Sequence, residues 1–74
     1  MNPNAQQWRC ELVYPEGVTK HIVFAAKYRW EAQENADHIA RDESREEGCT
    51  VSVRRIRMLP REEWLPIDQL GEIT

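Results

Sequence analysis

Two histidines, two cysteines and thirteen carboxylates are the side chains of this 74-residue sequence that could carry out chemistry. Their spacing does not define a catalytic site, because no glycine-rich phosphate loop, H-E-x-x-H or G-x-S-x-G motif occurs. The histidines and cysteines also lack the short ligand spacings of a zinc site; they are Cys10, His21, His38 and Cys49. We therefore expect a protein that is not an enzyme and that uses no metal or cofactor.

The cysteine content indicates the cellular compartment. Small secreted domains usually carry several cysteines in a disulfide framework, whereas Cys10 and Cys49 are the only two here. We expect two buried, reduced thiols, with a single disulfide as the alternative. No apolar run approaches the ~20 residues that span a bilayer. The polar residues 1–7 do not have the pattern of a signal peptide, so we expect a cytoplasmic protein with no membrane contact.

Charge is distributed unevenly along the chain, whose net charge is −3. Residues 29–47 carry seven acidic and three basic side chains, whereas the four charged side chains of residues 48–61 are all arginines. The acidic segment is either a solvated helix with i,i+4 ion pairs or a surface that docks on a basic, nucleic-acid-handling protein. In the second case, complementary fields would raise the association rate.

Trp30 is the most informative aromatic residue for binding. At 100° per residue it falls about 160° around the predicted helix from Ala32, so it should point away from the sheet. Tryptophan is enriched at binding hot spots. The alternative is that Trp30 folds over the first helical turn or packs on a terminal segment. The predicted partner-binding residues are Trp30, Glu31, Glu34, Asp37 and Glu43.

The arginines of the basic segment have two interpretations, because arginine suits both phosphate and carboxylate. They could meet a nucleic-acid backbone, or they could pair within the domain with Glu11, Glu62 or Glu63. Arginines on an edge strand also oppose aggregation. The overall acidity favours the internal role. The alternative nucleic-acid-binding residues are Arg54, Arg55, Arg57 and Arg61.

The elements that must position these residues begin with two strands. Residues 8–14 alternate, with one apolar face and one mostly polar face. The apolar face comprises Trp8, Cys10, Leu12 and Tyr14. A turn at residues 15–17 leads to a second strand over residues 18–24. The short connection predicts an antiparallel hairpin.

A helix and a third strand follow the hairpin. Ala32, Ala36 and Ala40 recur at helical spacing, so we expect a helix from residue 28 or 29 to Glu47, ended by Gly48. Its small side chains allow close packing on a sheet. Residues 50–58 form the third strand. The apolar residues occupy odd positions before Arg54 and Arg55 and even positions after them, which favours a β-bulge over a strand end.

The predicted fold is α+β: a ββαβ domain with a three-stranded antiparallel sheet in the order 3-1-2 and one helix on one face. The order follows from a right-handed crossover. Residues 1–7 are expected to be a loose arm, residues 8–58 the domain, and residues 59–74 a C-terminal tail. The second sheet face stays open unless the tail, or a second copy of the chain at an interface, covers it.

The layout of residues 20–58 resembles that of small phage-encoded anti-CRISPR inhibitors. The residues that carry the resemblance are the strand Ile22-Val23-Phe24-Ala25, the helix with Glu31-Ala32 and Ala36, and the strand Val51-Ser52-Val53. The resemblance implies a non-enzymatic inhibitor that docks on a bacterial defence complex, and it assigns no residue to that contact.

Three functional hypotheses follow from these observations. The first is a protein-binding module that occludes a nucleic-acid-handling complex, such as a CRISPR-type defence complex, through the acidic helix face. The second is a small nucleic-acid-binding accessory domain that uses the arginine-rich strand. The third is a structural homodimer formed by the open sheet faces or by exchanged tails.

Overall fold

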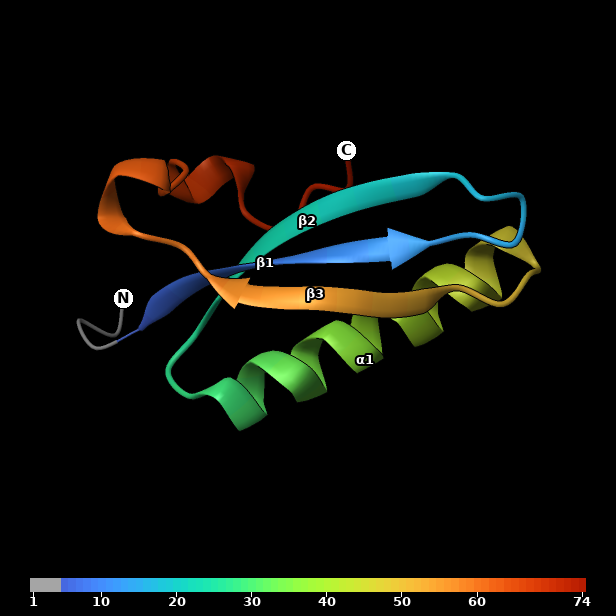
Figure 1. Cartoon of the computed structure of the whole chain (residues 1–74), viewed down its shortest axis with the longest axis horizontal. Helices are drawn as coiled ribbons and strands as arrows, with labels where there is room; N and C mark the ends of the chain where they lie inside the picture. Colours follow the sequence, from blue (N-terminus) through green and yellow to red (C-terminus); the bar gives the residue numbers. More distant parts are fainter. Residues whose placement is uncertain (1–4) are drawn as a thin grey trace.

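The computed structural model describes residues 5–74. It contains a three-stranded antiparallel sheet in the order β2-β1-β3 and one helix, which confirms the predicted α+β fold and strand order. The helix packs on one face of the sheet, and the C-terminal tail lies beyond β2 (Figure 1). The elements are β1 Gln6–Val13, β2 Thr19–Ala26, α1 Arg29–Glu47 and β3 Ser52–Met58, followed by the short 3-10 turns η1 Arg61–Glu63 and η2 Ile67–Gln69.

The alternation of β1 decides which side of the sheet faces the helix. Trp8, Cys10, Leu12 and Tyr14 are all buried, as predicted, and they form one core cluster with Ile22, Phe24 and Ala26 of β2 and the helix alanines. The indole nitrogen of Trp8 donates a hydrogen bond to the Ala26 carbonyl at 3.0 Å. This bond satisfies the one polar group of the buried ring.

The helix has the predicted limits. The Glu31 carboxylate accepts a hydrogen bond from the Tyr28 backbone N–H at 3.2 Å, next to the first turn. Gly48 ends the helix in the left-handed conformation, with φ 67°, which glycine adopts without steric cost. Ala32, Ala36 and Ala40 are buried against the sheet.

A β-bulge interrupts β3 at the point where the alternation of apolar residues changes, as the sequence indicated. Arg9 pairs with Arg57 and Glu11 pairs with Arg54, so the single residue Cys10 lies opposite two residues of β3. One of the two, Arg55, has a φ of 57° and is the only non-glycine residue with positive φ among residues 5–74. The bulge lets β3 contribute apolar side chains to the core both before and after the arginines.

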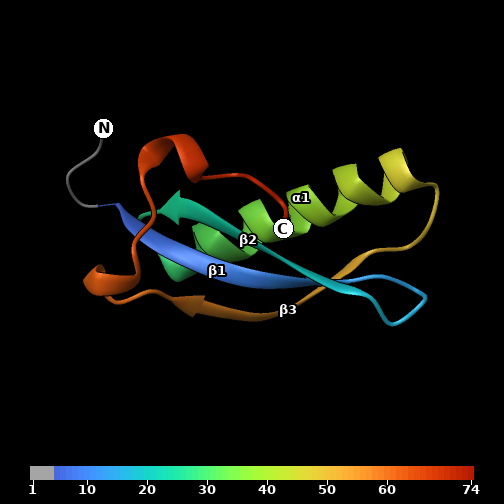
Figure 2. The ribbon, with the colours of Figure 1, turned by 90° about the horizontal axis from the view of Figure 1, so that it is seen from above.

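The far face of the sheet, defined as the face opposite α1, is held to the tail by Gln7. Its side-chain amide donates to the Leu65 carbonyl at 2.9 Å and accepts from the Leu65 N–H at 2.8 Å. Its backbone carbonyl accepts from the Leu59 N–H at 2.8 Å. Figure 2 shows the tail crossing the beginning of β1, where Gln7 lies. Gln6 and Gln7 thus belong to β1 rather than to the predicted arm, whose residues 1–4 lie outside the described residues.

The end of the tail pairs with the middle of the outer edge of β2, at His21 and Val23. Gly71 donates to the Val23 carbonyl at 2.8 Å, and Thr74 exchanges two backbone hydrogen bonds of 2.9 Å with His21. Val23 and Leu59 are buried outside the main core cluster. The tail therefore packs on the sheet, one of the two expected arrangements, and β3 is left as the unpaired edge of the described sheet.

Gln7→Ala should destabilise the protein by about 1–2 kcal/mol, because the two Leu65 backbone groups lose their partner in a partly buried position. For a domain of this size this lowers Tm by roughly 5–15 °C. Thermal unfolding measures the change. Gln6→Ala, one residue earlier in the same strand, is the matched control and should shift stability by less than about 0.5 kcal/mol. Equal Tm values for the two variants would contradict the role assigned to Gln7.

Candidate functional site

Three of the five predicted partner-binding residues lie on the same exposed side of α1. Trp30, Glu34 and Asp37 are spaced by four and then three residues, which places them on the same side of the helix. We call these three residues the acidic stripe. All three are exposed to solvent, and the Trp30 side chain keeps 62% of its surface accessible. The prediction that Trp30 points away from the sheet is confirmed.

Trp30 is held at the surface by an aromatic neighbour. Its ring stacks on that of Tyr28 with 6.2 Å between centroids and 14° between planes. The Lys27 ammonium lies 5.2 Å from the centroid of the Tyr28 ring. Two exposed aromatic rings therefore form an apolar surface at the beginning of the helix, immediately before the carboxylates of the acidic stripe. A stacked ring loses less conformational entropy when a partner covers it.

The other two predicted partner-binding residues have contacts inside the domain. Glu31 accepts the backbone hydrogen bond from Tyr28 described above. Glu43 is buried and accepts a 2.6 Å hydrogen bond from the Tyr14 hydroxyl, so its placement on the exposed acidic face was wrong. The physical reason is its spacing, because Glu43 follows Ala40 by three residues and continues the buried side of the helix. Burial and the hydrogen bond to Glu43 raise the pKa of Tyr14.

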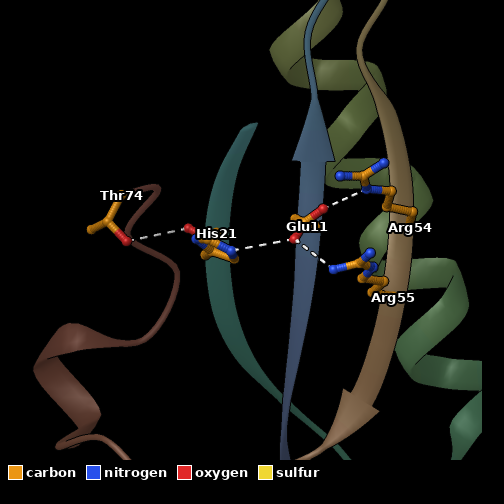
Figure 3. Close-up of polar contacts among 5 residues, drawn as sticks. All are labelled: Glu11, His21, Arg54, Arg55 and Thr74. Atoms are coloured by element: carbon orange, nitrogen blue, oxygen red, sulfur yellow. Dashed lines mark hydrogen bonds and ion pairs between the residues drawn. The ribbon is translucent and has the colours of Figure 1, made fainter. Parts of the chain in front are cut away.

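On the far face, Glu11 is the centre of a charged cluster (Figure 3). Its carboxylate is hydrogen-bonded to Arg54, and one of its oxygens lies 3.5 Å from His21 Nε2 and 3.9 Å from Arg55 Nη1. Only 12% of the Glu11 side chain is exposed. The hydrogen bond from Arg54 lowers the pKa of Glu11, and the charges of Arg54 and Arg55 add to this effect against desolvation.

The remaining arginines of the basic segment also have partners within the domain. Arg57 donates a 3.2 Å hydrogen bond to Glu63. The Arg61 guanidinium lies 4.5 Å from the centroid of the Trp64 ring. Three of the four arginines proposed for nucleic acid thus pair with Glu11 or Glu63, as the internal interpretation of the sequence predicted, whereas Arg61 contacts an aromatic ring. Arg55 is the most exposed of the three arginines that pair with a carboxylate, with 74% of its side chain accessible.

Arg9 is a functional candidate that the sequence analysis did not identify. It lies directly opposite Arg57 in the strand register and lines the same part of the far face as His21. The signal was present in the alternation of β1, because Arg9 and Glu11 must share the face opposite Cys10. What the sequence did not show is that Arg9 would face a second arginine.

The other side chains that could carry out chemistry are dispersed. His38 lies on the solvent side of α1, with Nε2 4.0 Å from an Asp42 oxygen. Cys10 and Cys49 are free thiols, the first buried and the second partly buried. Burial raises the pKa of Cys10 to about 11, and it also raises that of Cys49. Within residues 5–74, no three His, Cys, Asp or Glu side chains are grouped so that they could hold a metal ion.

Comparison with known proteins identifies no relative of this chain. No protein-family model matches the chain, and neither a curated protein nor a solved structure shows significant similarity to it. None of the helices in residues 5–74 has the length and apolar character needed to cross a membrane. The two charged surfaces described above are therefore the candidate functional features of the protein.

Glu11→Gln should reduce the loss of stability at acid pH. The pKa of Glu11 is lowered in the folded protein, so its ionised form contributes stability above the unfolded pKa of about 4.3, and this is lost as the pH falls through the folded pKa. Denaturant unfolding at pH 7 and pH 3 measures the effect. Glu34→Gln, on the solvent side of α1, is the matched control. The assignment fails if Glu11→Gln loses as much stability between the two pH values as the wild type.

Proposed function

We propose that this protein is a non-catalytic binding module that docks on a basic protein surface through the acidic stripe. The observation that carries the proposal is the exposed Trp30 ring, stacked on Tyr28 and in line with Glu34 and Asp37. A large apolar ring kept in solvent contributes little to the fold. Its burial under a partner would remove apolar surface from water.

The stacked pair Trp30–Tyr28 and the carboxylates of the stripe have different roles in such a contact. The aromatic pair would supply most of the binding energy, since tryptophan and tyrosine are enriched at hot spots. The carboxylates of Glu34 and Asp37 would attract a basic partner and orient it. A neighbouring basic side chain, Arg41, lies one turn beyond Asp37 and sets a limit to the acidic surface.

The class of partner that we propose is a bacterial nucleic-acid-handling complex. Such proteins present arginine and lysine surfaces that meet phosphate, and an acidic helix is complementary to those surfaces. The resemblance to phage-encoded anti-CRISPR inhibitors supports a CRISPR-type defence complex in the cytoplasm. The mechanism would be steric and electrostatic occlusion, without bond making or breaking.

The two alternative functions have less support. A nucleic-acid-binding role through the β3 arginines competes with their contacts to Glu11 and Glu63. The fourth arginine, Arg61 of η1, lies against Trp64. A homodimer through open sheet faces competes with the tail, which already occupies the Gln7 end of the far face.

Trp30→Ala should weaken partner binding about 30-fold, the effect of truncating a hot-spot residue worth about 2 kcal/mol. The double change Glu34→Lys/Asp37→Lys should weaken it at least as strongly and should reduce its salt dependence. The measurement is the inhibition by each variant of DNA binding by purified CRISPR effector complexes. A complex that responds to the wild type then gives Kd values for the variants.

Glu46→Lys/Glu47→Lys is the matched control for charge, because it changes the net charge equally on the same helix but away from the stripe. This variant should inhibit like the wild type. If it loses inhibition as fully as the stripe variants, net charge rather than the stripe determines binding. If no effector complex responds to the wild type, the inhibitor role is rejected.

A further inference from the structure

We propose that the far face carries a binding site for a single phosphate group, formed by Arg9, Arg55, Arg57 and His21. These side chains, with Cys10 and Glu11, line a groove of about 150 Å³ on the face opposite α1. The groove has room for one phosphate group. It lies across the sheet from the acidic stripe, so the proposal is independent of the proposed function.

Positive charge exceeds negative charge in the groove. Arg9 and Arg57 are directly opposite each other on adjacent strands, an arrangement that is destabilising for like charges. Arg57 has one hydrogen bond to Glu63, whereas Arg9 makes no ion pair with any residue from 5 to 74. A bound oxyanion between the two guanidinium groups would relieve their repulsion.

The carboxylate in the groove does not neutralise this excess. Glu11 already faces Arg54, Arg55 and His21. Its hydrogen bond to Arg54 uses one oxygen, and its other oxygen is nearer to His21 than to Arg55. Both oxygens are therefore directed to groups other than Arg9. The cations around the groove outnumber its carboxylate, and Arg9 and Arg57 keep donors for a ligand.

The backbone conformation at Arg55 independently supports a binding site. The β-bulge places this residue in the left-handed region, which is uncommon for a non-glycine side chain. The bulge turns Arg55 to the same face as Arg54, with its Nη1 3.9 Å from Glu11 and most of its side chain in solvent. Bulges of this kind re-aim a side chain next to binding sites. Here the re-aimed group is a cation at the groove.

Arginine chemistry and the adjoining surface determine the class of ligand. The guanidinium group binds a phosphate oxygen pair through two parallel N–H donors. A second groove continues from Arg9 and His21 towards the tail, and it is lined by the carboxylates of Glu63 and Glu72. A long polyanion would meet these carboxylates, so the site favours one phosphate group of a small ligand over a nucleic-acid strand.

Titration of the protein with inorganic phosphate at constant ionic strength tests the proposal. Backbone amide NMR shifts should saturate and should be centred on residues 9, 55 and 57. Arg9→Gln should weaken binding about tenfold, the typical effect of losing a charge-assisted hydrogen bond. Glu11→Gln should bind phosphate more tightly, because it removes the negative charge from the groove wall.

Arg41→Gln is the matched control, because it removes the same charge from the solvent side of α1 and should leave the phosphate affinity unchanged. If Arg9→Gln does not fold, Arg55→Gln replaces it. Arg55→Gln should fold, because the exposed Arg55 side chain contributes little to the core, and it should show the same tenfold loss of phosphate affinity. Shifts that do not saturate, or that change equally in Arg9→Gln and Arg41→Gln, would overturn the proposal.

Two further ligands distinguish the sources of the phosphate group. A nucleoside monophosphate that competes with inorganic phosphate supports a site for small phosphate esters. A 12-nucleotide single strand without a terminal phosphate should bind no better than the monophosphate. Binding of this strand alone, with no response to phosphate or monophosphate, would overturn the single-group site and favour a nucleic-acid contact instead.

Discussion

A single helix covers only one face of a three-stranded sheet, and the arrangement of this protein depends on how the second face is closed. Gln7 supplies the connection, because its amide satisfies both backbone groups of Leu65 and its carbonyl accepts from Leu59. The tail then returns to β2 and pairs with its outer edge. The far face is thus covered at one end and open at the other, where the charged groove lies.

The way in which α1 packs on the sheet explains why its outward side carries the acidic stripe. A buried side made of alanines leaves little apolar surface elsewhere on the helix, and the outward side is free to carry charge. Trp30 is the exception, because it is exposed and its ring stacks on that of Tyr28. The acidic stripe and the charged groove of the far face therefore lie on opposite sides of the sheet. Both could be occupied at once, without one ligand blocking the other.

The carboxylates of this protein have different roles that their residue type alone does not reveal. Glu31 binds a backbone N–H next to the first helical turn, Glu43 is buried against Tyr14, and Glu11 organises the far-face cations. Glu34 and Asp37 remain in solvent. Each of these three carboxylates accepts a hydrogen bond, and for the buried Glu43 and the largely buried Glu11 this bond offsets the cost of removing a charge from water. The carboxylates that stay exposed on the solvent side of α1 are the better candidates for a partner contact.

The sequence by itself determined the order of elements, the ends of the helix, the apolar face of β1 and the position of the bulge. These features follow from local periodicity and from single residues such as Gly48. Only the tertiary structure decided the partners of Gln7, Arg9 and Glu43. Their contacts join residues 58, 48 and 29 positions apart in the chain. No local pattern encodes such pairings, because they depend on strand register and on the path of the tail.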